Sequence, residues 1–346
     1  MQRTEIAMLG EFGLIDHLTK DTKLTQKTSV KGVGDDAAVL DNSGKQTLVT
    51  TDLLLEGIHF DLTYVPLKHL GYKAAIVNFS DIYAMNGRPQ QITVSLGISK
   101  RFSVEDLESF YEGLKLACEI YGVDIVGGDT TSSLTGLTIS ITCIGIADAG
   151  NIVYRNGAKN TDLIYVSGDL GASYMGLQLL EREKTVFDGK GEFQPDFAGK
   201  EYLLERQLKP EARKDIIEKL AENHIIPTSM IDISDGLSSD VLHICKQSNV
   251  GCQIYEDRLP IDYQTAAMAE TFNMNVTTVA LNGGEDYELL FTVPLHLHEE
   301  MSSVEGIHLI GHITKPENGC FLATRDGQEM QLRAQGWNSM RSNKKT

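Results

Sequence analysis

Six short acidic motifs constrain this chain most, because each places a carboxylate beside glycine or at the end of an apolar segment. Glycine lets the backbone bend sharply and lets a ligand approach closely. In α/β sheets, ligands tend to bind where the strands end. The motifs are Gly34-Asp35-Asp36-Ala37, Thr50-Thr51-Asp52, Asn78-Phe79-Ser80-Asp81, Gly127-Gly128-Asp129-Thr130-Thr131, Asp232-Ile233-Ser234-Asp235-Gly236 and Gly283-Gly284-Glu285-Asp286-Tyr287-Glu288. Together they predict acidic side chains gathered at a binding site.

Asp81 stands in the most apolar setting of these motifs, within residues 74–85. That segment is apolar on nearly every helical face, so part of it must be buried. A buried carboxylate is costly unless it is paired or bound to a metal ion. Lys73 lies two helical turns away and is a poor partner. Asp81 therefore either binds a metal ion or caps a neighbouring helix, and the residues alone leave both interpretations open.

Converging carboxylates would need a shared cation. Two carboxylates about 4 Å apart repel by roughly 4 kcal/mol at an effective dielectric constant near 20. The motifs offer hard oxygen ligands and no cluster of Cys or His, which favours Mg²⁺. No calcium-binding loop of the EF-hand type is present in the sequence. For any single Gly-Asp pair, an ordinary turn remains the alternative.

The length of 346 residues exceeds what one hydrophobic core usually serves, so we expect two domains. The polar, Gly-containing segment 149–160 marks the boundary between domains 1–150 and 151–346. Expected strands and helices mix in both halves, which predicts α/β or α+β architecture throughout. The clearest helix is 104–121, with Ser103 as its N-cap, Asp106 completing a capping box and Gly122 at its end.

The net charge of −17 argues against a nucleic-acid partner, which would require a basic face. No apolar run of about 18 residues exists in the sequence, and the start resembles no secretory signal. The chain is therefore expected in the cytoplasm, with no membrane partner. Its five cysteines form no CxxC pair and are interpreted as reduced structural thiols, not as a zinc site.

Nucleotide-binding loops of the familiar types are absent from the sequence. No G-x-x-x-x-G-K-[ST] motif occurs, no G-x-G-x-x-G follows a strand, and no protein-kinase motif set is found. A nucleotide would then be held through metal-bridged phosphates and backbone amides. No convincing Ser, His and Asp combination offers a covalent nucleophile.

In their order and spacing, the six acidic motifs resemble those of the thiamine-monophosphate kinase family, within the aminoimidazole-ribonucleotide-synthetase-like superfamily. The segment Glu56-Gly57-Ile58-His59-Phe60 belongs to the same resemblance, which spans roughly residues 30 to 290. Each motif is weak alone, whereas the ordered set is specific. Tyr83 and Asn86 stand where the family often has Ala and Gly.

The resemblance implies a two-domain fold, a homodimer paired through the first domains, and several Mg²⁺ ions. It also implies transfer of the ATP γ-phosphoryl group to thiamine phosphate, the last step of thiamine diphosphate biosynthesis. Carried over by position, it gives Asp36, Thr50, Thr51, Asp52, Asp81, Asp129, Asp232 and Asp235 as metal ligands. It gives Tyr111, Gly128, Asp129, Arg155 and Ser234 as ATP contacts, and His59, Glu285 and Trp337 as thiamine-phosphate contacts. No covalent catalytic residue is expected.

Two alternatives remain at this point. One is another ATP-using synthetase of the same superfamily. Selenophosphate synthetase carries a reactive Cys or Sec near its start, whereas the first cysteine here is Cys118. The hydrogenase-maturation relative ends in a reactive cysteine, whereas this sequence ends Ser342-Asn343-Lys344-Lys345-Thr346. The other is a non-catalytic sensor of Mg-nucleotide or thiamine diphosphate. A sensor would bind ATP without releasing ADP.

Overall fold

The computed structural model describes residues 14, 17–31, 39–42, 44–186 and 197–335. Contacts divide the chain into two units, Met1–Ile152 and Val153–Thr346. Each unit is built of helices and strands, so the predicted two-domain α/β class is confirmed. No helix in the described part of the chain is long and apolar enough to cross a membrane.

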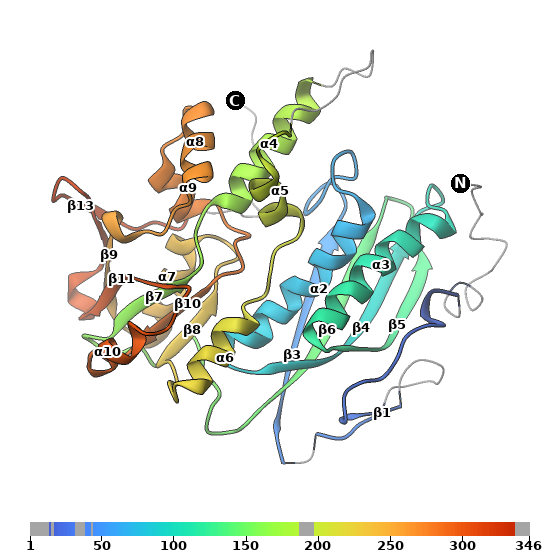
Figure 1. The fold of residues 1–346 in the computed structure, drawn as a ribbon, viewed down its shortest axis with the longest axis horizontal. Helices are drawn as coiled ribbons and strands as arrows, with labels where there is room; N and C mark the ends of the chain where they lie inside the picture. The colour runs from blue at the N-terminus through green and yellow to red at the C-terminus, as the bar shows by residue number, and fades with distance from the viewer. Residues whose placement is uncertain (1–13, 15–16, 32–38, 43, 187–196, 336–346) are drawn as a thin grey trace. The chain divides into compact units, whose positions relative to one another are not determined.

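A four-stranded sheet with two long helices forms the first unit (Figure 1). The strand order is β3-β6-β4-β5, with β4 and β5 parallel and the other neighbours antiparallel. The strands are β3 (Gln46–Leu55), β4 (Arg88–Ile98), β5 (Asp124–Ser132) and β6 (Thr138–Ala147), and the helices are α2 (Leu67–Ala84) and α3 (Val104–Tyr121). A separate antiparallel pair is formed by β1 (Ser29–Lys31) and β2 (Val39–Leu40).

Helix α2 lies against both the sheet and α3, which explains why its sequence is apolar on nearly every face. Two glycines let the helix backbones approach. A Cβ added at Gly71 would lie 1.9 Å from the Phe110 carbonyl oxygen, and one added at Gly113 would lie 1.7 Å from that of Lys68. The apolar segment around Asp81 is therefore buried between the sheet and α3, as its composition predicts.

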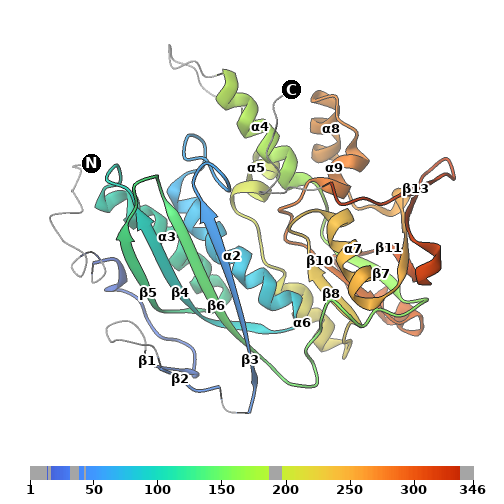
Figure 2. The ribbon, with the colours of Figure 1, turned by 180° about the vertical axis from the view of Figure 1, so that it is seen from behind.

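Within the described part of the first unit, helices cover one face of the sheet and leave the other uncovered. Along β6, buried and half-buried residues alternate, as expected when α2 and α3 cover one side only. The other face, seen from behind in Figure 2, carries Val49 and Leu53, which are 66% and 52% exposed. Large apolar side chains on an uncovered sheet face are typical of a protein–protein contact.

Asn86 and Tyr83, which the sequence analysis noted as departures from the resemblance, lie at the end of α2. Asn86 has φ 57°, a left-handed conformation that asparagine tolerates better than most residues. Its side-chain amide donates to the Asn151 carbonyl at 2.7 Å. Tyr83 is buried, with its ring centroid 6.2 Å from that of Tyr121. Both departures are thus accommodated by local packing.

A seven-stranded mixed sheet forms the second unit, in the order β13-β12-β9-β11-β7-β10-β8. The strands are β7 (Leu163–Ser167), β8 (Ser229–Asp232), β9 (Gly251–Tyr255), β10 (Leu289–Val293), β11 (Ile307–Thr314), β12 (Cys320–Ala323) and β13 (Glu329–Gln331). The α-helices are α4 (Ala172–Val186), α5 (Glu201–Leu208), α6 (Lys214–Glu222), α7 (Leu237–Ser248), α8 (Tyr263–Thr271), α9 (Val276–Asn282) and α10 (His298–Met301). Short 3₁₀ turns are η2 (Glu256–Arg258), η3 (Leu295–Leu297) and η4 (Pro316–Asn318).

Two apolar clusters hold the second unit together. One lies between α7 and the sheet and includes Val241, Ile244 and Ile254. The other joins α4 to α5, α8 and α9 through side chains such as Met175 and Leu203. The first cluster fixes β8, which ends at Asp232, and the start of α7, so it also fixes the turn between them that contains Asp235.

Candidate active site

In the first unit, strand β3 presents Thr50 and Asp52 on the face that α2 covers. The Thr50 hydroxyl donates a hydrogen bond of 2.5 Å to a carboxylate oxygen of Asp81 on α2. Asp52 follows two positions along β3, so its side chain lies on the same face of the strand. The structure thus brings Asp81 together with two β3 residues that lie about 30 positions earlier in the sequence.

The electrostatics of this group fit a divalent cation. Burial, followed by the charge of Asp81, raises the pKa of Asp52 from 3.8 to about 6. The raised pKa means that burial and the nearby Asp81 carboxylate both disfavour the ionised form of Asp52, which a bound cation would offset. Its donors are carboxylate and hydroxyl oxygens, which are the ligands that Mg²⁺ prefers. Thr50, Asp52 and Asp81 are therefore chemically suited to hold Mg²⁺.

Thr51, between these residues, points to the opposite face of β3. Its hydroxyl donates to the Ile141 carbonyl at 3.0 Å and accepts from the Thr142 hydroxyl at 3.1 Å. The side chain is thus engaged with β6, away from Asp81. The sequence prediction that Thr51 is a metal ligand remains untested by this arrangement, because a backbone oxygen can also bind a metal ion.

Gly128 and Asp129 lie on β5, at the opposite edge of the sheet from β3. A Cβ at Gly128 would lie 1.9 Å from the Val94 carbonyl oxygen, so the close approach of β4 and β5 requires glycine here. Asp129 is exposed, and one of its carboxylate oxygens accepts the Thr130 N–H at 2.9 Å. Its carboxylate is accessible to a ligand or metal ion.

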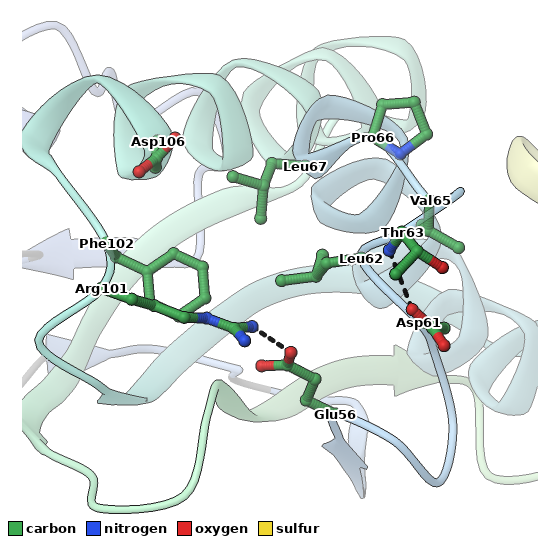
Figure 3. Close-up of a pocket in the computed structure, with 10 residues that line it drawn as sticks. All are labelled: Glu56, Asp61, Leu62, Thr63, Val65, Pro66, Leu67, Arg101, Phe102 and Asp106. Carbon is green, nitrogen blue, oxygen red and sulfur yellow. Dashed lines mark hydrogen bonds and ion pairs between the residues drawn. The ribbon is translucent and has the colours of Figure 1, made fainter. Parts of the chain in front are cut away.

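His59 lies in the turn that follows β3. Its Nδ1 accepts the backbone N–H of Leu55 at 3.1 Å, so a neutral ring carries its proton on Nε2. Next to this turn, a cavity of about 510 Å³ is lined by both polar and apolar side chains. Figure 3 shows Glu56 paired with Arg101 on one side of it and Leu62 and Leu67 on another.

Tyr111, predicted as an ATP contact, belongs to the buried face of α3. It is 7% exposed and packs edge-on against Phe110, with ring centroids 5.8 Å apart. Burial raises the pKa of its phenol to about 12. Its role in the described conformation is packing within the first unit, and its contact with ATP remains a prediction.

In the second unit, three aspartates gather where β8 meets α7. Asp232 ends β8, Asp235 lies in the turn, and Asp240 lies in the first turn of α7. Burial, followed by the charges of Asp232 and Asp235, raises the pKa of Asp240 from 3.8 to about 8. In this second group, too, burial and neighbouring carboxylates disfavour ionisation, and the group offers oxygen ligands. Asp240 was not predicted from the sequence, although a polar residue four positions after Gly236 is the signal that could have revealed it.

The loop after α9 lies against the turn that contains Ser234. The N–H of Glu285 donates to the Ser234 carbonyl at 2.7 Å, and that of Tyr287 donates to Ile233 at 2.9 Å. Glu285 and Tyr287 have φ values of 56° and 52°, which is strained for residues with side chains. The structure thus places predicted ATP and substrate contacts, Ser234 and Glu285, side by side.

The contacts of two buried carboxylates in this segment, Asp286 and Glu288, were not predicted from the sequence. Glu288, 1% exposed, forms ion pairs with Arg206 at 2.9 Å and with Arg213, and it accepts the Ser167 hydroxyl at 2.5 Å. Asp286 accepts the backbone N–H of Gly171, and burial raises its pKa to about 7. These contacts hold the strained loop in place. The sequence could not reveal these ion pairs, because Arg206 and Arg213 lie outside the acidic motifs and meet Glu288 only in the folded chain.

Three further residues were predicted from the sequence as site residues, namely Arg155, Asp36 and Trp337. Arg155 is exposed, and its charge, with that of His243, opposes the burial that raises the pKa of Asp235. Arg155 is thus electrostatically linked to the second acidic group. Asp36 and Trp337 lie outside the described residues.

Family models match both units of the chain. The N-terminal domain of AIR synthase related proteins matches residues 34–147, and the C-terminal domain of the same family matches residues 160–294. Together with two α/β units that each hold an acidic group, these matches define a two-domain AIR synthase related protein.

Similarity to curated proteins identifies the family within the AIR synthase related proteins. The chain is 36% identical to the thiamine-monophosphate kinase of Aquifex aeolicus over 329 residues, which cover 95% of this chain and 97% of the relative. It is 32% identical to that of Bacillus subtilis, with 95% and 99% covered. The chain belongs to the thiamine-monophosphate kinase family, which is a family of enzymes.

Solved structures agree with this assignment. A structure described as AaThiL complexed with AMPPCP and TMP matches with a TM-score of 0.74 and 35% identity, covering 97% of this chain and 98% of that one. The thiamine-monophosphate kinase of Stenotrophomonas maltophilia matches with a TM-score of 0.78 and 30% identity, covering 93% and 98%. The family resemblance expected from the sequence is confirmed.

Proposed function

We propose that this protein transfers the γ-phosphoryl group of ATP to thiamine monophosphate, giving thiamine diphosphate and ADP. The observation that carries the proposal is the group formed by Thr50, Asp52 and Asp81, a half-buried oxygen-ligand site in a chain of this family. A similar structure contains AMPPCP, an ATP analogue, together with TMP, which supports both substrates.

Mg²⁺, when bound, would neutralise the phosphate charges and let an acidic protein bind two anions. Thr50, Asp52 and Asp81 would hold it in the first unit, and Asp232 and Asp235 in the second. Asp36, Thr51 and Asp129 complete the proposed set of ligands for several ions. Asp240, which shares its charge environment with Asp232 and Asp235, would position their carboxylates.

For the nucleotide, we propose contacts from Gly128, Asp129, Arg155 and Ser234, together with Tyr111. Gly128 and Asp129 are exposed on β5, and Arg155 adds positive charge that acts on Asp235. For thiamine monophosphate, the proposed contacts are His59, Glu285 and Trp337. The Gln207 amide donates to Glu285 at 3.1 Å and orients its carboxylate.

The proposed reaction is direct in-line transfer. The acceptor is already a phosphate anion, so it requires no strong general base. The residues of this chain position the two phosphates and hold the cations that balance their charge. No covalent phosphoryl intermediate on the protein is proposed, and the cytoplasmic location expected from the sequence remains a prediction.

We also propose that the chain forms a homodimer through the uncovered face of its first sheet. Val49 and Leu53 project from this face, and Val49 pairs across the ladder with Ile144 on β6. A second copy would bury these apolar side chains. Sedimentation of wild type and Leu53→Lys would test this, because a charge on the face should shift a dimer towards monomer.

The proposed activity is tested by ADP release. With Mg-ATP, wild type should release ADP on addition of thiamine monophosphate, and free thiamine should not substitute. Asp81→Asn should abolish this release while circular dichroism stays unchanged. Asp257→Asn, at an exposed position, is the matched control and should retain activity. ADP release that is independent of the acceptor, or full activity in Asp81→Asn, would refute the proposal.

A further inference from the structure

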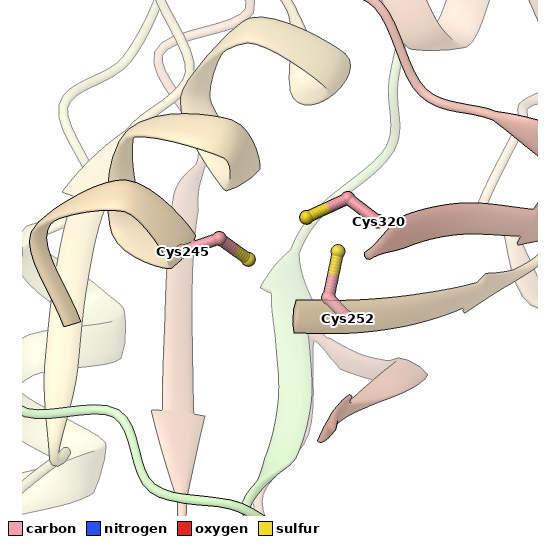
Figure 4. Close-up of side chains that lie close together, drawn as sticks. All are labelled: Cys245, Cys252 and Cys320. Atoms are coloured by element: carbon pink, nitrogen blue, oxygen red, sulfur yellow. The ribbon is translucent and has the colours of Figure 1, made fainter. Parts of the chain in front are cut away.

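Three cysteines of the second unit, distant in sequence, meet in the structure. Cys245 lies near the end of α7, Cys252 on β9 and Cys320 at the start of β12. Their sulfur atoms all lie within 4.8 Å of one another. Figure 4 shows the three side chains directed towards a common centre, with α7 on one side and the two strands on the other.

The fold holds this arrangement firmly. Cys252 and Cys320 are register partners in the parallel pair β9–β12, so their side chains emerge on the same face of the sheet. The N–H of Cys252 donates to the Gly319 carbonyl at 3.1 Å, which fixes the start of β12 beside β9. Cys245 approaches from α7, whose Ile244 packs in the apolar cluster on that face.

The surroundings of the sulfur atoms are apolar, and one of the three cysteines is partly exposed. Cys245 and Cys252 are 3% and 1% exposed and belong to the cluster that contains Ile254 and Leu322. Cys320 is only partly buried. An ion could therefore enter past Cys320 and be held away from water by the other two thiols.

The ligand chemistry selects the class of ion. Among the residues that the structure describes, the group contains three sulfur donors and no carboxylate or imidazole. Metal–sulfur bonds of about 2.3 Å in a planar, three-coordinate site place the sulfurs about 4 Å apart, within the separations observed. Zinc is almost always four-coordinate in structural sites. Soft thiolates favour Cu(I), which accepts three sulfurs without a fourth ligand.

We propose that Cys245, Cys252 and Cys320 form a three-sulfur site for a soft monovalent ion, Cu(I). Each cysteine that binds as a thiolate releases its proton to solvent, and copper stays Cu(I), so no electron is transferred. The site is built from residues that the proposed kinase reaction does not use. Its test therefore does not depend on the proposed function.

The experiment measures copper binding by the full-length protein, reduced and kept free of oxygen. Cu(I) is added in the presence of bathocuproine disulfonate, a chromogenic competitor, and protein-bound copper is quantified after desalting. Wild type should retain one Cu(I) per chain and gain ultraviolet thiolate-to-copper absorption. Cys252→Ser and Cys320→Ser should each weaken binding at least about 100-fold, since losses of 10- to 100-fold follow even from outer-shell changes.

Matched controls keep the outcome interpretable. Cys118→Ala removes a buried thiol of the first unit and should bind copper as wild type does. Cys320→Ser, at the partly buried position, serves where Cys252→Ser fails to fold, as judged by circular dichroism. Equal copper retention in a folded Cys320→Ser variant, copper lost entirely to the competitor by wild type, or tighter retention of Zn²⁺ than of Cu(I) would each overturn the proposal.

Discussion

The Thr50 hydroxyl donates a 2.5 Å hydrogen bond to the carboxylate of Asp81 and so joins strand β3 to helix α2. This contact fixes Asp81 on the same side of β3 as Asp52. Burial, followed by the charge of Asp81, then raises the pKa of Asp52 to about 6. The Thr50 hydroxyl thus orients Asp81 beside Asp52, and a cation bound there would stabilise both carboxylates in their ionised form.

Replacing Thr50 tests this orientation. Thr50→Val keeps the shape and β propensity of the side chain but removes the hydroxyl. We expect a higher Mg²⁺ concentration for half-maximal activity and roughly a tenfold loss of kcat/KM, equivalent to about 1.4 kcal/mol. Thr50→Ser should restore both. Thr93→Val, at a half-buried threonine of β4 in the same sheet, is the control, and an equal loss there would show that the effect is not specific to Asp81.

The pKa of Asp52 predicts how Mg²⁺ binding depends on pH. Burial and Asp81 raise this pKa to about 6, so the carboxyl group is protonated below pH 6 and ionised above it. Because Mg²⁺ binds the ionised form, its affinity should fall below pH 6 by up to about tenfold per pH unit. Calorimetric Mg²⁺ titrations between pH 5 and 8 measure this. The slope should flatten in Asp52→Asn, and an affinity independent of pH in wild type would contradict the assignment.

The sequence predicted a helix accurately where residues that mark both of its ends are present. Helix α3 begins and ends as its capping box and Gly122 predict, with Ser103 and Asp106 exchanging hydrogen bonds and Gly122 at φ 70°. Strand β4 was missed, although Ile92 and Val94 follow the alternation of a strand. Its first half contains Gln91, a buried polar residue that becomes acceptable only because its amide donates to Thr28 and Ser29. No local pattern could show that.

The candidate site divides in the same way. The sequence indicated which short motifs carry carboxylates, because glycine and apolar neighbours mark them locally. It could not show that Thr51 points away from Asp81, since strand phase is set by the register with β6. Nor could it show Asp240 beside Asp232, because that proximity depends on how α7 packs. The metal-binding roles of these residues therefore stay predictions, now with geometry to test them.

Asp240 predicts a pH dependence of stability. Its pKa in the folded protein is about 8, above the value of 3.8 for the unfolded chain. A group with a raised pKa stabilises the fold fully below the unfolded value, and that contribution is lost as the pH rises through the folded value. Without Mg²⁺, the free energy of unfolding should therefore fall from pH 4 to pH 8. Urea unfolding should show a flatter profile for Asp240→Asn, and parallel profiles would count against the shifted pKa.

Two neighbouring glycines provide a test of the contact between β4 and β5. Gly128→Ala would place a Cβ 1.9 Å from the Val94 carbonyl oxygen, so the strands must separate. We expect a loss of about 1–3 kcal/mol in the free energy of unfolding, the usual cost of overpacking. At Gly127 the nearest atom to an added Cβ is Thr93 Cγ2, at 3.8 Å, so Gly127→Ala should be close to neutral. Similar losses in both variants, measured by urea unfolding, would show that close approach is not the cause.

The buried ion pairs of Glu288 set the last prediction. Glu288→Gln keeps the side-chain shape but leaves Arg206 and Arg213, each 14% exposed, without their shared carboxylate. Breaking a buried pair in this way should lower the free energy of unfolding by about 3–5 kcal/mol, because uncompensated charge stays buried. Glu205→Gln removes an exposed pair with Lys209 and should cost no more than about 0.5 kcal/mol. Since Glu288 ends the strained loop that carries Glu285, the KM for thiamine monophosphate should also rise in Glu288→Gln. Equal stability of the two variants in urea would mean that the arginines are compensated by their other acidic neighbours.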